Sequence, residues 1–563
     1  MHWRWEVPAW VAVLLLMLVG LPLFVCMPLW ADTTLYDLAA RNLLDGGIHY
    51  RDIFDTNLPG MVWLHAGIRA LVGWRSEALR AVDFLVFLGI AGLLARWLAG
   101  LGWSRAARVW VVFALLVYYF SQSEWSHCQR DTWMLLPALA ALHLRRRQVA
   151  DLAGNEAPLC RLVGRAVLEG ILWGLAFWIK PFVGLPALAV WLAGVLLVRP
   201  GGRARLLMVD AACLLIGGLL VGGAGTIWLW SSGTWPYFWN VLFHWDRDYY
   251  GHGPSLLARS RLLYRSLRPW GWLHFVALPL AARMLRRDST DAREGRLSLS
   301  ERASSFAERK TTLVLLAAFY LGWLVQATYL QKPYDYVLAS IVPLALIVVA
   351  GHRWQGVRPC LRWAALAAFA AAVAVGHPLL QPQRLALWDR CWQEGSTPEL
   401  RDRLKLATAP DTPDWSDLAR VAAELRRLHV GDYELTCFHN SPHPLYLDLG
   451  VQPSTPFLHF GTLLHYFPGR HEEIRQILAA SRQRYVVSDV RHAGLTMTES
   501  AAQPLPSAAE ERVTAVGVSL PLHFPPRLRD VFPWSEPVIF RTRRYLIHEV
   551  RGPVGRLVPP RNP

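Results

Sequence analysis

The sequence is poor in charge and lacks any cluster of paired cysteines. Only 18% of its 563 residues are charged, whereas 53% are hydrophobic and the mean hydropathy is positive. This composition excludes an intrinsically disordered chain and an ordinary soluble domain. The seven cysteines are odd in number and form no CxxC pair, which excludes a disulfide scaffold and a zinc finger. Cys391 and Cys437 could form a disulfide in an oxidising compartment, a pairing that the sequence leaves open.

Long apolar runs fill the first two thirds of the chain. A helix needs roughly 17 to 25 apolar residues to cross a hydrocarbon core of about 30 Å, so the shorter runs must extend into their flanks. The first run is followed by Leu29-Trp30-Ala31, which supplies one of the two small residues that signal peptidase requires, and we interpret it as a retained anchor. We therefore predict a polytopic α-helical membrane protein with about eleven transmembrane helices. The runs cover residues 7–30, 81–98, 107–120, 132–144, 163–179, 182–198, 206–230, 270–284, 311–330, 336–350 and 363–380.

The net charge of +16 is distributed as in a membrane protein rather than a nucleic-acid-binding protein. Most arginines lie in every second loop between apolar runs, and the alternate loops are longer, aromatic and mixed in charge. Because cytoplasmic loops carry the excess of Lys and Arg, we predict a cytoplasmic N-terminus and no nucleic-acid partner. The alternate loops (residues 31–80, 121–131, 231–268 and 331–335) and the C-terminal region are then extracytoplasmic.

The composition changes near residue 381, after the last apolar run. Helical periodicity at 414–428 and 472–480, with short β-type runs at 433–438 and 484–489, predicts a small α/β domain over residues 381–563. We accordingly divide the chain into a transmembrane domain, 1–380, and this extracytoplasmic domain. The histidines of the C-terminal domain match no known metal-site spacing, so we favour scattered surface histidines over a metal site. These are His439, His443, His459, His465 and His471.

The first outer loop, residues 31–80, holds the most informative pattern. Apolar residues at helical spacing between 35 and 43 predict a helix that Gly46-Gly47 ends, with Asp32 as its N-terminal cap. A capping role alone would explain Asp32. Two further carboxylates, Asp52 and Asp55, return from the other end of the same loop, and this context favours a functional role.

These residues resemble the first periplasmic loop of GT-C membrane glycosyltransferases. The matching pattern is Asp32, Tyr36, Ala40, Leu43-Leu44, Gly46-Gly47, Tyr50-Arg51-Asp52, Phe54-Asp55 and Pro59-Gly60. The most similar group is glycosyltransferase family 39, with the protein mannosyltransferases and the bacterial aminoarabinose transferases. The resemblance implies a GT-C fold and makes Asp32 the catalytic carboxylate. The chain has Asp32-Thr33 where the family often has Asp-Glu, and Asn57-Leu58-Pro59 where it often has Lys-Pro-Pro.

The resemblance continues to about residue 380. Asp131 matches an acidic residue that opens the fourth helix of the family, and Lys180 matches a lysine near the donor phosphate. Lys332 and Tyr336 match a basic and aromatic cluster before the tenth helix.

Physical chemistry gives these residues roles in sugar transfer. Charges at the ends of membrane spans need a polar cavity or partners. Transfer from a polyprenyl-phosphate sugar needs a base for the acceptor hydroxyl and cations for the leaving phosphate. We assign Asp32 as the base, which gives inversion at the anomeric carbon. The other candidate catalytic residues are Asp52, Asp55 and Asp131. The candidate phosphate ligands are Arg130, Lys180 and Lys332; for the two lysines, snorkelling to the interface is the alternative.

The second large outer loop is aromatic and carries His244 and Arg247, which we include as candidate substrate contacts. An interfacial aromatic belt explains the rings equally well. His244 with Asp246 and Asp248 could bind a divalent cation, Mg²⁺ or Mn²⁺, although the same residues could form a surface ion-pair cluster. No cofactor is required by any motif.

The sequence therefore predicts an integral membrane glycosyltransferase of the bacterial inner membrane. It would move a monosaccharide from a polyprenyl-phosphate donor to a lipid, glycan or protein acceptor on the extracytoplasmic face. No Gly-rich nucleotide loop is evident, which favours a lipid-linked donor. The alternative is a protein that binds or transports a lipid-linked glycan without catalysis. Transport would need polar groups along the spans, and the sequence shows almost none there.

Overall fold

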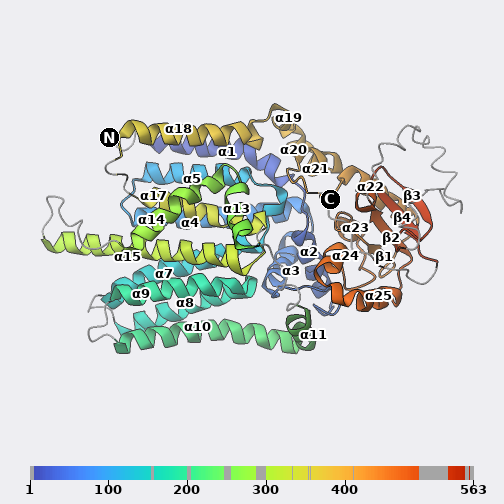
Figure 1. Ribbon diagram of the computed structural model, residues 1–563, viewed down its shortest axis with the longest axis horizontal. Coiled ribbons are helices and arrows are strands. Elements are labelled where there is room, and N and C mark those ends of the chain that lie inside the picture. The colour runs from blue at the N-terminus through green and yellow to red at the C-terminus, as the bar shows by residue number, and fades with distance from the viewer. Residues whose placement is uncertain are drawn as a thin grey trace.

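The computed structural model describes residues 6–153, 158–198, 204–245, 255–286, 299–332, 334–352, 354, 357–409, 411–493, 531–551 and 557. These residues form a bundle of long helices and, at one end of it, a domain of short helices with a small β-sheet (Figure 1). The predicted fold class, a helical membrane domain followed by a small α/β domain, is confirmed.

Each of the eleven predicted apolar runs forms a helix of the bundle. Among the described residues, seven helices are long and apolar enough to cross a membrane, and the helices that fall short of this are α5, α7, α14 and α17. The number of helices that cross the membrane stays a prediction. The bundle consists of α1 (Glu6–Val25), α4 (Ser76–Ala99), α5 (Arg105–Phe120), α7 (Leu135–Ala153), α8 (Leu159–Ile179), α9 (Gly184–Val198), α10 (Ala204–Ser231), α14 (Leu273–Arg286), α15 (Leu299–Val325), α17 (Ile341–Gly351) and α18 (Pro359–Gly376).

The start of α1 and the first outer loop lie at opposite ends of the bundle (Figure 1). Helix α1 begins at the end opposite the C-terminal domain (Figure 1). There Glu6 pairs with Arg105 at the start of α5, with 3.0 Å between Arg105 Nε and Glu6 Oε1. At the other end, the α2 and α3 helices of the first outer loop lie between the bundle and the C-terminal domain (Figure 1). Which end faces the cytoplasm stays a prediction.

Helices α8 and α10 pack with their backbones in contact. A side chain at Gly170 would overlap the carbonyl of Leu214, and one at Gly217 would overlap the carbonyl of Val167. Small residues at such positions let membrane helices approach closely. This packing holds α8, whose far end carries Lys180.

A buried ionic network lies within the bundle, where the sequence showed almost no polar groups. Arg145 of α7 donates to Glu169 of α8 at 2.9 Å and to Asp210 of α10 at 2.7 Å, and all three side chains are buried. Gln148 also donates to Asp210, at 3.0 Å. Paired in this way, the charges tie three helices together.

The first outer loop is folded around a second buried ion pair. Its helices are α2 (Asp32–Leu44) and α3 (Gly60–Val72). Arg69 of α3 donates to both oxygens of Asp37 of α2, from Nε at 2.8 Å and from Nη2 at 2.5 Å, and His65 Nδ1 lies 2.9 Å from the same carboxylate. Because these side chains are buried, they fix the orientation of α2 and therefore of Asp32.

The C-terminal domain has a four-stranded sheet in the order β1-β2-β4-β3, with β1 and β2 parallel and the other pairs antiparallel. Its first two strands and two of its helices lie where the sequence predicts them; β3 and β4 were not predicted. The strands are β1 (Leu435–Cys437), β2 (Tyr485–Asp489), β3 (Val538–Arg541) and β4 (Tyr545–Glu549). The helices are α19 (Pro382–Leu385), α20 (Trp388–Glu394), α21 (Pro398–Leu404), α22 (Trp415–Arg427), α23 (Pro444–Leu449), α24 (Phe460–Tyr466) and α25 (His471–Ala479).

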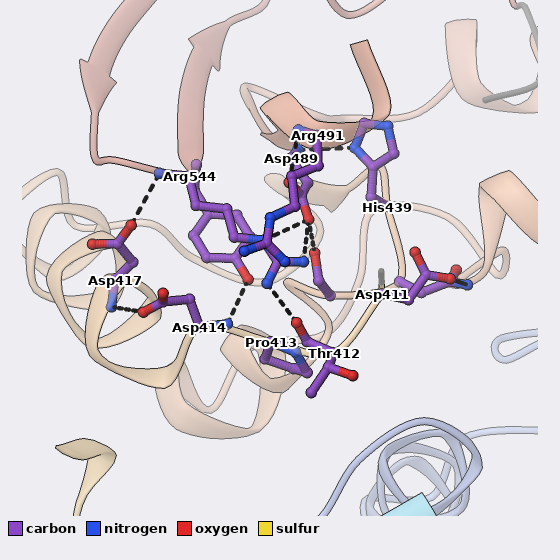
Figure 2. A network of polar contacts seen from close by, with 12 residues as sticks. Asp411, Thr412, Pro413, Asp414, Asp417, His439, Asp489, Arg491 and Arg544 are labelled. Carbon is purple, nitrogen blue, oxygen red and sulfur yellow. Dashed lines mark hydrogen bonds and ion pairs between the residues drawn. The ribbon is translucent and has the colours of Figure 1, made fainter. Parts of the chain in front are cut away.

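The C-terminal domain is stabilised by polar contacts rather than by disulfides. Cys391 and Cys437 are free thiols, so the disulfide that the sequence left open does not form. Instead, Arg544 at the start of β4 pairs with Asp489 at the end of β2, at 2.6 Å (Figure 2). The backbone amide of Arg544 also donates to Asp417 of α22, at 2.9 Å, so this contact joins the sheet to its covering helix.

Candidate active site

Six of the predicted site residues gather at the end of the bundle that faces the C-terminal domain. They come from four segments that are far apart in the sequence. Two lie on α2, one on the return of the first outer loop, two on the short helix α6 (Arg130–Trp133) and one at the end of α8. We call them the outer cluster: Asp32, Tyr36, Asp55, Arg130, Asp131 and Lys180.

Lys180 and Asp131 form the buried ion pair of the outer cluster. Lys180 Nζ lies 2.6 Å from Asp131 Oδ2, and the two side chains are 5% and 0% exposed. Helix α8 ends just before Lys180 because Pro181 follows and disfavours a helical conformation there. The first outer loop touches the same place: a side chain at Gly60 would overlap the backbone of Trp178.

Arg130 lies over the ring of Tyr36, with its Cζ atom 5.7 Å from the ring centroid. Both side chains are buried, and the Tyr36 hydroxyl has no hydrogen-bond partner among the described residues. A cation over an aromatic face is stabilised by the ring quadrupole, and it leaves the donors of the guanidinium to other groups. Arg130 also interacts electrostatically with Asp32 and Asp55.

Asp32 is the partly exposed carboxylate of the outer cluster. It is the first residue of α2, and the capping position is taken by Ala31, which has a φ of 54° and makes no side-chain cap. The prediction that Asp32 is the N-terminal cap is therefore wrong: the cap is Ala31, one residue earlier. Its carboxylate interacts electrostatically with Tyr36 and Lys180 as well as with Arg130. A carboxylate in the first helical turn is stabilised by the helix dipole.

Asp55 is the buried carboxylate on the return of the first outer loop. Burial raises the pKa of Asp55 to about 7, against the opposing effects of Arg130 and of the hydrogen bond from Asn57. Its neighbour His49, whose Nε2 lies 4.0 Å from Asp55 Oδ2, is neutral because burial lowers the pKa of His49 to about 3. Two interacting carboxylates with different environments can take different protonation states at one pH.

Asp52 lies outside the outer cluster. It accepts hydrogen bonds from the backbone amide of Ile48 at 2.6 Å and from Arg51 Nε at 2.6 Å. These contacts close the turn between Ile48 and Asp52. The geometry therefore gives Asp52 a structural contact within the loop.

Lys332 precedes α16 (Asp335–Ala339), and Tyr336 lies in its first turn. The ring centroid of Tyr336 is 6.0 Å from Lys180 Nζ, beside the outer cluster. Lys332 instead lies over the ring of Tyr466 of the C-terminal domain, with its Nζ atom 3.0 Å from the ring centroid. Burial lowers the pKa of Lys332 to about 7.

His244 is exposed, and no contact joins its side chain to the outer cluster among the described residues. Its backbone carbonyl accepts a hydrogen bond from Arg470 of the C-terminal domain. Arg247, Asp246 and Asp248 lie outside the described residues. Within the described ranges, no group of three or more His, Cys, Asp or Glu side chains is placed to hold a metal ion.

The sequence did not indicate how closely the C-terminal domain covers the outer loops. The Glu124 carboxylate accepts from the backbone amides of Leu406 and Ala407, at 2.8 Å and 3.1 Å. The Phe54 amide donates to the carbonyl of Pro456 at 2.9 Å, one residue from Asp55. His439 and His443 are buried, each 2% exposed, and not scattered over the surface as the sequence suggested.

Comparison with known proteins identifies the fold. No protein-family model matches this sequence, and no curated protein matches it. Two solved structures of ArnT from Cupriavidus metallidurans are similar over nearly their whole length. The apo form is 14% identical, with a TM-score of 0.55 and coverage of 97% of each chain. The form bound to undecaprenyl phosphate is 12% identical, with a TM-score of 0.54 and coverage of 96% of this chain and 97% of that one.

This chain has the ArnT fold. The GT-C fold implied by the first outer loop is thereby confirmed. The coverage extends over the transmembrane bundle and the C-terminal domain alike, so the ArnT fold accounts for both parts of the chain and for their order.

Proposed function

We propose that this protein is a membrane glycosyltransferase that transfers a monosaccharide from a polyprenyl-phosphate donor to an acceptor on the extracytoplasmic face. The observation that carries the proposal is the outer cluster itself. A carboxylate that is partly exposed, Asp32, lies within electrostatic reach of two buried cations, Arg130 and Lys180, on an ArnT fold. This is the combination that proton removal and phosphate departure require.

In the proposed reaction, the acceptor hydroxyl attacks the anomeric carbon of the donor sugar. Its proton passes to the Asp32 carboxylate, the new glycosidic bond forms, and the bond from the anomeric carbon to the phosphate oxygen breaks. The polyprenyl phosphate leaves with the electron pair of that bond. Attack opposite the leaving group in a single displacement inverts the anomeric configuration.

The two buried cations stabilise the phosphate in this proposal. Lys180 has three donors, so it can keep its bond to Asp131 while it donates to a phosphate oxygen. The planar guanidinium of Arg130, lying over Tyr36, suits bidentate phosphate binding. One ArnT structure holds undecaprenyl phosphate, which supports a polyprenyl-phosphate donor for this fold. Lys332 Nζ lies over the ring of Tyr466 of the C-terminal domain, so we assign phosphate binding mainly to Lys180 and Arg130 and only secondarily to Lys332.

We propose that the reaction needs no divalent cation. Lys180 and Arg130 already supply positive charge at the place where the leaving phosphate would develop its negative charge. His244 is therefore not proposed as a metal ligand.

The experiment that tests the function is sugar transfer by the purified protein in lipid nanodiscs. Undecaprenyl-phosphate sugars are supplied in turn as donors, and wild type is compared with Asp32→Asn. We expect transfer by the wild type and a loss of about 10²- to 10⁴-fold in the variant, as for removal of a general base. Transfer that survives Asp32→Asn would refute the base assignment. Binding of undecaprenyl phosphate without transfer from any donor would favour the alternative of a binding or transport protein.

We also propose that the protein lies in the bacterial inner membrane with its N-terminus in the cytoplasm. Two native cysteines test this orientation, because Cys160 and Cys360 are exposed and lie at the predicted cytoplasmic ends of α8 and α18, whereas the other five are buried. A maleimide that cannot cross membranes should label them in inverted vesicles but not in intact spheroplasts. Labelling in intact spheroplasts would reverse the orientation.

A further inference from the structure

One segment of the C-terminal domain is anchored on the loops that carry the outer cluster. We call residues 456–467 the docking segment. At its start, the Pro456 carbonyl accepts from the Phe54 amide at 2.9 Å, and the Phe457 ring lies 5.4 Å from the Phe54 ring. Near its end, the Tyr466 hydroxyl lies 2.7 Å from that of Tyr334. His459 lies between these two anchors, and its ring interacts electrostatically with Asp32.

The hydrogen bonds around His459 determine which ring nitrogen carries the proton. Asn440 Nδ2 donates to Asp411 Oδ2 at 3.0 Å, so the amide oxygen of Asn440 is the atom that faces His459 Nδ1, at 3.3 Å. That oxygen can only accept, and Nδ1 must therefore carry the hydrogen. Burial lowers the pKa of His459, against the effects of Asp32 and Asp411, which favours the neutral ring. In the neutral ring, the lone pair is on Nε2.

The loop that orients His459 is itself rigidly held. Residues on both sides of Asn440 contact the end of β2: His439 Nδ1 accepts from the Asp489 amide at 3.0 Å, and Ser441 Oγ donates to Asp489 Oδ2 at 2.6 Å. The guanidinium of Arg544 donates to the same carboxylate, at 2.6 Å (Figure 2). This network leaves Asn440 little freedom to turn away from the ring.

The Nε2 atom of His459 is buried and has no hydrogen-bond partner in the part of the chain that the structure describes. His443, whose ring centroid lies 4.5 Å away, makes an edge contact rather than a hydrogen bond to it. A buried acceptor without a donor is destabilising, because it has lost its hydrogen bond to water. A ligand hydroxyl that donates to Nε2 removes this penalty.

We propose that His459 binds the acceptor substrate: its Nε2 atom accepts a hydrogen bond from an acceptor hydroxyl beside Asp32. Asn440 and Asp411 are positioning residues that set the tautomer of His459. The proposal rests on the glycosyltransferase function and deepens it, because it places the recognition of the acceptor partly in the C-terminal domain. The ligand class is a molecule with neighbouring hydroxyls, of which one reacts at Asp32 and one binds His459.

The test is a kinetic comparison of full-length variants in nanodiscs, with an undecaprenyl-phosphate sugar and an acceptor that the wild type uses. We expect His459→Leu, which removes the acceptor atom, to raise the KM for the acceptor about tenfold, because one hydrogen bond is lost, and to leave the KM for the donor within about twofold. The matched control is His465→Leu, which changes an exposed histidine of the same segment and should match the wild type. Asn440→Leu should reproduce the acceptor defect, and the double variant should be no worse than either single one.

Four outcomes would overturn the proposal. Unchanged acceptor kinetics in His459→Leu would refute it and leave the transferase function standing, as would an equal loss of donor and acceptor affinity. Failure of the wild type to transfer from any donor would refute the function and this inference together. If His459→Leu does not fold, ¹⁵N NMR of wild-type protein labelled in its histidines gives the second measurement. An Nε2-protonated His459 ring would contradict the proposal.

Discussion

Helix α8 takes part in two charge clusters that differ in their access to solvent. We call the first, formed by Arg145, Glu169 and Asp210, the inner network; the second is the outer cluster. Midway along the helix, Glu169 shares Arg145 with Asp210, and all three side chains are 1% exposed. At its end, Lys180 pairs with Asp131, and Arg130, Asp32 and Asp55 lie around that pair. The inner network is enclosed by three helices, whereas the outer cluster includes the partly exposed Asp32 and lies next to a second domain. Burial of charge is therefore common to both clusters, and access to the charges distinguishes the two.

The inner network should matter for stability and not for substrate binding. Arg145→Met leaves Glu169 and Asp210 buried without their cation, and we expect a loss of about 3–5 kcal/mol in stability. Thermal unfolding in detergent measures it as a lower midpoint. The matched control adds Glu169→Gln and Asp210→Asn to Arg145→Met, which should restore most of the midpoint. A single variant as stable as the wild type would contradict a structural role for the network.

Stability should depend on pH through the outer cluster. Because the pKa of Asp55 is raised to about 7, the folded protein holds a proton there that the unfolded chain releases near pH 4. The stabilisation is complete at low pH and is lost as the pH rises through about 7, by about 3 kcal/mol between pH 5 and pH 8. Asp55→Asn removes this proton, so its thermal midpoint should fall less than that of the wild type over this interval. Parallel pH curves for the two proteins would contradict the buried, protonated carboxyl.

The outer cluster should matter for phosphate binding. Lys180→Met should weaken the binding of undecaprenyl phosphate about 10- to 100-fold, the loss expected for a hydrogen bond to a charged group. Since that change also leaves Asp131 unpaired, the control is Lys180→Met with Asp131→Asn. We expect the double variant to regain stability without regaining affinity. Recovery of affinity in the double variant would show that Lys180 acts only by neutralising Asp131.

Chelation should have the smallest effect. If Arg130 and Lys180 supply the positive charge at the phosphate, EDTA should change the transfer rate by less than about twofold. Transfer that stops with EDTA and returns with Mg²⁺ or Mn²⁺ would restore the cation alternative for the loop that contains His244.

The bundle could be predicted from the sequence more completely than the site. Every apolar run became a helix, because the hydrophobic demand of the membrane is local and continuous along the chain. Asp32 and Lys180 could be singled out because they lie next to spans. The Arg145 network could not, since its members are 24 and 65 residues apart and each looks like an isolated charge. The strands β3 and β4 were missed because they are short, and because their hairpin joins the sheet only through the distant strand β2.

The sequence by itself determined the membrane class, the positions of the helices and the segregation of basic loops, because hydropathy and charge act residue by residue. It also singled out the carboxylates of the first outer loop and their resemblance to a known fold. The tertiary structure alone decided which charges meet. It separated Asp52 from Asp55, paired Lys180 with Asp131, and brought His459 of a distant domain into electrostatic reach of Asp32. Such pairings depend on how helices and loops pack across hundreds of residues, and no local pattern records them.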